Sequence, residues 1–135
     1  MFTPAQIAFA LVLLIATAGA FLRGGPVERR GAGLFAFGMA AFVVAEAVTF
    51  NGVRAGTLFA IDLLVLFGLV ALAWKSPRPW PVYACGFQTM VLAGHVARWI
   101  DLDMDAGFHF WLMLTLNMGA LAVLTLGAWL KPKGR

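Results

Sequence analysis

The chain has 135 residues, of which 62% are hydrophobic and 12% carry a charge. Soluble globular domains contain about 25% charged and about 45–50% apolar residues, so this composition excludes a soluble enzyme or binding module and predicts an all-α integral membrane protein. The formal net charge is +4. The basic residues lie in short clusters between apolar runs, a pattern that indicates membrane topology and excludes nucleic acid as a partner.

Apolar stretches in five places predict membrane-spanning helices, each of which needs about 18 or more residues with few charges. They are predicted at residues 5–22, 34–50, 56–74, 80–100 and 109–130, joined by short connections. The prolines fall at or outside these ends, as expected for a residue that breaks a helix interior. We expect a single domain over residues 1–135, built as a bundle of five transmembrane helices.

The second span is the shortest, and the distribution of basic residues argues for keeping it. Five spans place eight Lys and Arg side chains on one side of the membrane and two, Arg54 and Arg98, on the other. Four spans would divide them five against five. Because basic residues accumulate on the cytoplasmic side, five spans are favoured, with a periplasmic N-terminus and a cytoplasmic C-terminus. The tryptophans, among them Trp80, fall at the predicted membrane interfaces, where indole rings prefer to lie.

The amino-acid usage indicates a bacterial inner membrane as the location of this chain. Arginine outnumbers lysine by seven to three, and alanine and glycine are abundant, which is typical of a GC-rich bacterial gene. We expect the lipid bilayer to be one partner, together with other membrane subunits or further copies of the chain.

Ionisable side chains inside the spans gather near the predicted outer ends, and the cytoplasmic half is predicted to hold almost none. At about 1.5 Å per residue, Glu46, Asp62 and His95 lie roughly 6–9 Å below the outer ends of their spans. The predicted intramembrane cluster consists of Glu46, Asp62, His95, Arg98 and Asn117, and a polar outer mouth of Arg54, Asp101, Asp103, Asp105 and His109. Such residues are costly in lipid and mark functional sites. Two interpretations stay open: a clasp between helices, or an outward-facing proton, cation or small-ligand site.

Redox cofactors have little support in the sequence. His95 and His109 are the only histidines, so they form the one pair that could ligate a b-type haem, and His109 lies closer to the outer edge. Cys85 is the only cysteine, which excludes a disulfide framework and a thiolate metal cluster. No cofactor is expected, and a haem bound by these two histidines is the alternative.

The loop after the fourth predicted span carries three alternating aspartates, Asp101, Asp103 and Asp105. They resemble the opening of an EF-hand calcium loop, but Ala106 and Leu112 stand where that loop needs glycine and glutamate. The loop is expected to be a solvated acidic turn, with a looser cation site that includes His109 as the alternative. The chain also lacks the short catalytic motifs of phosphate-binding loops and zinc proteases, so no enzymatic activity is predicted.

Small side chains recur on two spans, and in lipid such rows let helices approach closely. They are Cys85, Thr89, Ala93 and Ala97 in the fourth span and Gly119 and Gly127 in the fifth. These rows predict packing inside the bundle, or self-association if one lies outside.

The predicted function is a non-catalytic accessory or assembly subunit of an inner-membrane complex, or a structural oligomer. One alternative is a small oligomeric channel or ion-coupled transporter that uses the outward polar site. Another is a redox subunit that binds haem or quinone near His95.

Overall fold

A computed structural model describes residues 4–48 and 54–130, which form five α-helices and no β-strand. The helices are α1 (Pro4–Arg23), α2 (Pro26–Val48), α3 (Arg54–Lys75), α4 (Trp80–Ile100) and α5 (Ala106–Trp129). The all-helical prediction is confirmed. The predicted bounds of four helices agree with the structure within three residues at each end, and α2 is the exception.

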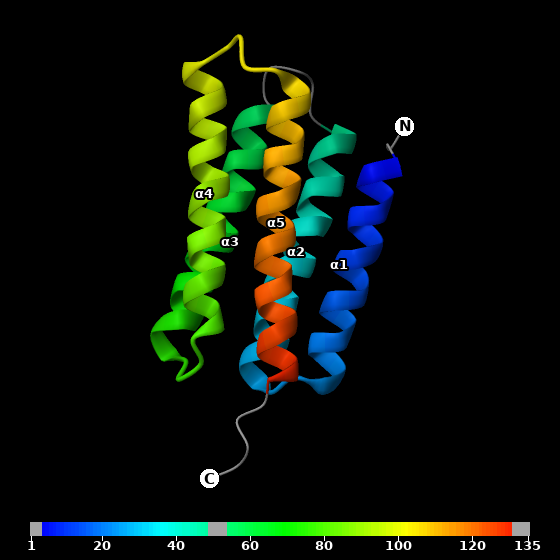
Figure 1. Ribbon diagram of the computed structural model, residues 1–135, viewed down its shortest axis with the longest axis vertical. Coiled ribbons are helices and arrows are strands. Elements are labelled where there is room, and N and C mark those ends of the chain that lie inside the picture. The colour runs from blue at the N-terminus through cyan, green and yellow to red at the C-terminus, as the bar shows by residue number, and fades with distance from the viewer. Residues whose placement is uncertain (1–3, 49–53, 131–135) are drawn as a thin grey trace.

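The helices form a ring in chain order. Each helix packs against its neighbours in sequence, and α5 closes the ring against α1 and also contacts α2. Figure 1 shows the α1–α2 turn, the α3–α4 connection and the end of α5 together at one end of the bundle, with the α4–α5 loop at the other. We call the end that holds the α1–α2 turn the lower end, and the end that holds the α4–α5 loop the upper end. Short connections between antiparallel helices produce this arrangement.

The second helix begins at Pro26, eight residues before its predicted start, so the predicted long basic loop is reduced to Gly24 and Gly25. Proline suits the first turn of a helix because it has no N–H to leave unpaired. Glu28 Oε2 accepts the Gly25 N–H at 2.9 Å, which is the backward half of a capping box. A Cβ atom on Gly24 would lie 2.3 Å from the Ala20 carbonyl oxygen, so the turn requires glycine there.

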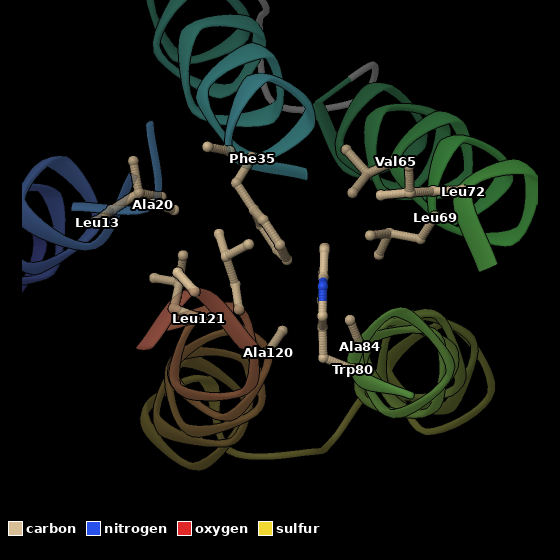
Figure 2. Packing of buried hydrophobic residues seen from close by; sticks show 13 residues of the cluster. Leu13, Ala20, Phe35, Val65, Leu69, Leu72, Trp80, Ala84, Ala120 and Leu121 are labelled. Atoms are coloured by element: carbon tan, nitrogen blue, oxygen red, sulfur yellow. The ribbon is translucent and has the colours of Figure 1, made fainter. Parts of the chain in front are cut away.

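The centre of the bundle is filled by one tryptophan. Trp80 is 3% exposed, and its indole extends from α4 into the middle of the ring, between Phe35 and Leu69 (Figure 2). Two glycines make room for it: a Cβ atom on Gly31 or Gly127 would lie 2.3 or 2.5 Å from the indole. Trp80 begins α4 at one end of the bundle, as predicted, but its ring points inward, and the sequence analysis did not predict this burial.

Two helices in the described part of the chain are long and apolar enough to cross a membrane, Ala55–Lys75 and Ala106–Trp129. Only 17% and 22% of their most apolar segments are buried inside the protein, whereas the core helix of a soluble protein is mostly buried. The apolar part of α1, Ile7–Arg23, is shorter. Charged residues at the start of α2 and polar residues along α4 lower their hydropathy. By length and hydropathy, two of the five described helices qualify as membrane spans, and the other three do not.

Candidate functional site

Three side chains from α3 and α4 form a polar cluster in the upper half of the bundle, which we call the Asp62 cluster. Gln88 Nε2 donates to Asp62 Oδ1 at 2.8 Å, and His95 Nε2 lies 2.9 Å from Asp62 Oδ2. Gln88 and His95 stand two turns apart on α4, so they face the same neighbouring helix. The structure thus brings together two of the ionisable residues that the sequence placed at similar depth, Asp62 and His95.

The Asp62 cluster is largely screened from the surroundings. Gln88 is 1% exposed, and the side chains of Asp62 and His95 are 23% and 11% exposed. The ring of Phe59 meets His95 edge-on at 6.3 Å and lies 5.0 Å from the ring of Trp99. Low polarity around an ion pair or hydrogen bond strengthens it electrostatically.

His109 extends this cluster to α5. Its ring meets the His95 ring at 5.8 Å between centroids and 61° between planes. The Nε2 atom of His109 is buried and has no hydrogen-bond partner among the described residues. Buried polar atoms without a partner are uncommon in folded proteins and cost about 1–3 kcal/mol. A small proton donor or acceptor from outside the chain would satisfy this nitrogen.

Gly94 lies beside His95 on α4, where a side chain of α5 packs against it. A Cβ atom on Gly94 would lie 2.0 Å from the Met113 Cε atom. The end of the Met113 side chain therefore covers Gly94 beside His95, and it would have to move if a larger residue stood there. Close packing at a small residue is typical of helices that associate in lipid.

Arg98, predicted as part of the cluster, has a different role. Its Nη1 atom donates to the carbonyl oxygens of Leu102, at 3.0 Å, and of Met104. Arg98 therefore fixes the α4–α5 loop, with backbone carbonyls as its hydrogen-bond acceptors. No ion pair joins Arg98 to a carboxylate within residues 4–48 and 54–130.

Asn117 is the remaining residue of the predicted cluster whose side chain the structure describes. Asn117 donates to the Met113 carbonyl oxygen of its own helix at 2.9 Å, so it satisfies itself locally. The side chains of Glu46 and Arg54 lie outside the residues that the structure describes.

Two of the three aspartates of the upper loop accept hydrogen bonds from backbone N–H groups. Asp101 Oδ1 accepts the Asp103 N–H at 3.1 Å, and Asp105 caps α5 by accepting the Phe108 N–H at 2.8 Å. Aspartate is a preferred residue at both kinds of position because its short carboxylate reaches nearby N–H groups. Among the described side chains, no group of three or more His, Cys, Asp or Glu is placed to hold a metal ion.

The two histidines are not arranged to ligate a haem between them. In a haem with two histidine ligands, the macrocycle lies between the two imidazole rings, and each ring points one nitrogen atom at the iron. Here the rings of His95 and His109 meet edge to face, and His95 Nε2 already contacts the Asp62 carboxylate.

A second polar cluster, which the sequence analysis missed, lies at the lower end around Glu28. This glutamate is 1% exposed. Trp80 Nε1 donates to Glu28 Oε1 at 3.2 Å, and the Gly25 N–H donates to Oε2. Arg78 Nε lies 3.7 Å from Oε1. The sequence analysis left Glu28 in the loop before the second predicted span, whereas the structure places it in the first turn of α2. The available signal was the sequence Gly25-Pro-Val-Glu28, which is typical of a helix start.

Further contacts make the lower end a fixed structure. Arg78 Nη1 also lies 3.4 Å from the Leu130 carbonyl oxygen, beyond α5. Arg29 Nε donates to the Phe21 carbonyl oxygen of α1 at 3.0 Å. Both carboxylate oxygens of Glu28 have partners inside the chain. This cluster therefore stabilises the fold and offers no unpartnered oxygen to a ligand.

The predicted small-residue rows separate into two groups. Gly119 and Gly127 do pack inside the bundle, against the rings of Phe87 and Trp80. The row on α4 does not, because Gln88 and His95 give that helix a different buried face. Its members Thr89 and Ala93 are exposed, and Cys85 and Ala97 are half-buried.

No family model, no curated protein and no solved structure matches this chain. Of the two clusters, the one at the lower end is satisfied by its own residues, whereas the Asp62 cluster adjoins an imidazole nitrogen that has no partner. The Asp62 cluster is therefore the candidate functional site.

Proposed function

We propose that the chain is a five-span protein of a bacterial inner membrane that acts as a non-catalytic accessory or assembly subunit, or as a structural oligomer. The observation that supports this best is an apolar exterior around a filled interior. Large apolar side chains face outward on several helices, with Ile15 72%, Leu22 82% and Phe67 62% exposed. Soluble monomers rarely expose contiguous apolar patches above a few hundred Å², whereas lipid solvates such a surface.

The charges at the two ends support an orientation with the lower end in the cytoplasm. Basic side chains crowd that end, namely Arg23, Arg29, Arg30, Lys75 and Arg78. The upper loop carries three aspartates instead. By the positive-inside rule, this distribution favours an N-terminus outside and a C-terminus in the cytoplasm.

The interior argues for a supporting role and against a transport path through one chain. Below the Asp62 cluster the bundle is filled by buried apolar side chains, including Leu69, Leu121, Leu124 and the indole of Trp80. A conduction path needs polar groups or water along its length. Within the described residues, the Asp62 cluster ends on Gln88, with apolar packing beyond it.

Native mass spectrometry after affinity purification in a mild detergent tests the accessory role. We expect either additional polypeptides bound to the chain or multiples of its 14.5 kDa mass. Additional polypeptides would identify the complex that it serves, and bare multiples would identify a structural oligomer. A single chain with nothing bound, in several mild detergents, would contradict the proposal.

The Asp62 cluster favours one second candidate, an outward-facing proton or cation site in an ion-coupled oligomer. It combines a carboxylate, an imidazole 2.9 Å away and a further imidazole with an unpartnered nitrogen. A series of carboxylate and imidazole side chains inside a membrane is typical of a proton relay. Because the interior of one chain is filled, such a path would run between chains.

The substitution Asp62→Asn separates a helix clasp from an ion site. We expect it to weaken the bundle by about 1 kcal/mol, the usual strength of a polar contact between membrane helices, and to leave the proton permeability of vesicles unchanged. The measurements are resistance to unfolding by a denaturing detergent and the decay of a pH gradient. Asn117→Ala is the matched control, because Asn117 contacts only its own helix. A wild-type proton flux that Asp62→Asn abolishes would establish the second candidate instead.

A further inference from the structure

A shallow groove runs between α2 and α3 from the lower end towards the middle of the bundle. It encloses about 430 Å³, with Arg30 and Lys75 at its lower end and Gly33, Leu34, Gly68 and Ala71 along its length. Lys75 and Gly68 are seven residues apart on α3, so the groove extends roughly 10 Å along the helix axis. It is an open, mostly apolar groove with two cations at one end.

The two cations of this groove differ from the other arginines of the lower end. Arg30 and Lys75 are exposed and have no hydrogen bond or ion pair within residues 4–48 and 54–130. Arg29, by contrast, donates to a backbone carbonyl, and Arg78 lies beside the Glu28 carboxylate. No acidic residue lines the groove. Its mouth is therefore positively charged and not neutralised by the chain itself.

We propose that this groove binds one anionic phospholipid, with the phosphate between Arg30 and Lys75 and an acyl chain along Gly33, Gly68 and Ala71. The proposal rests on the membrane location proposed above. With the lower end in the cytoplasm, both cations lie at headgroup level, and the groove lies among the acyl chains. Basic side chains at that level attract anionic lipids, each contributing about 1 kcal/mol.

The charge pattern favours a lipid over a second copy of the chain. Copies in one membrane share their orientation, so a neighbour packed on this face would bring its own basic lower end towards Arg30 and Lys75. Like charges at close range oppose such a contact. A lipid places a phosphate at the cations and a flexible apolar chain in the groove, which matches both features at once.

Gly33 offers a variant that fills the groove without disturbing the fold. A Cβ atom at this position would meet nothing within 4 Å, so Gly33→Leu adds a side chain to open space. Gly68 is unsuitable, because its Cβ atom would lie 2.5 Å from Leu34. Gly19 on α1 also has nothing within 4 Å, and Gly19→Leu is therefore the matched control.

The experiment measures lipid retention by native mass spectrometry, on protein equilibrated with mixed micelles of phosphatidylglycerol and phosphatidylcholine. We expect the wild-type protein and Gly19→Leu to retain one phosphatidylglycerol. The double variant Arg30→Gln/Lys75→Gln should lose its preference for that lipid by about tenfold or more. Gly33→Leu should lose retention as well, although both cations are kept.

Three outcomes would overturn the lipid site. They are equal retention of the two lipids by the wild-type protein, unchanged retention by Gly33→Leu, and displacement of the lipid by inorganic phosphate at millimolar concentration. The last would show an anion site that does not use the groove. Solubility of the protein without detergent would instead contradict the membrane location, so failure of the two proposals can be distinguished.

Discussion

Replacing Trp80 by alanine should cost about 3–5 kcal/mol of unfolding free energy, the range for large aromatic side chains removed from a packed interior. The indole is 3% exposed and lies against Gly31 and Gly127, so its loss empties the middle of the ring. Glycines cannot fill this space because they have no side chain to rotate into it. The measurement is unfolding in a mild detergent titrated with a denaturing one.

Trp74 provides the control for this prediction. It belongs to α3 at the same end of the bundle and is 88% exposed. Trp74→Ala removes an equal volume from the outside and should change the stability by about 0.5 kcal/mol or less. Equal stability of Trp80→Ala and Trp74→Ala would show that the indole of Trp80 does not lie in the centre.

The positions of the helices could be predicted because hydropathy along the chain reports them directly. Apolar runs bounded by prolines and charges located α4 at 80–100, the bounds that the structure has. The start of α2 was missed for a physical reason. Glu28, Arg29 and Arg30 interrupt the apolar run, although Gly25 and Pro26 carry the signals of a helix start.

The sequence predicts how deep each polar side chain of the candidate site lies along its helix, but not which neighbouring helix the side chain faces. Helix rise places Asp62 and His95 at similar heights, and the structure shows them 2.9 Å apart. The same reasoning assigned Asn117 to the cluster, because sequence position does not fix which neighbour a side chain faces. The acceptors of Arg98 are backbone carbonyls, and because every residue has a carbonyl, no pattern of residue types reveals such a contact.

Trp80 shows the limit of reading one position at a time. At the end of an apolar run, tryptophan usually lies at the membrane interface. Its burial here depends on Gly31, far back in the chain, and on Gly127, far ahead. Only the meeting of three distant segments creates the space, so a scan along the sequence does not detect it.

Replacing Glu28 by alanine should cost about 3 kcal/mol or more, because removal of one partner from a buried ion pair leaves the others without compensation. The Trp80 Nε1–H and the Gly25 N–H lose their acceptor, and Arg78 loses its carboxylate. Glu28→Gln keeps an acceptor oxygen and should cost less. Asp103→Ala, at an exposed acidic residue, should change the stability by about 0.5 kcal/mol or less. The measurement is again detergent unfolding.

A double-mutant cycle then tests whether Glu28 and Trp80 act as a pair. Trp80→Phe keeps an aromatic ring in the centre but removes the N–H that Glu28 accepts. Groups that share a hydrogen bond couple by about 0.5–3 kcal/mol, so Glu28→Ala combined with Trp80→Phe should cost less than the sum of the single variants. Strictly additive costs would show that the two residues stabilise the lower end independently. Coupling would identify their contact as the link between the α1–α2 turn and the start of α4.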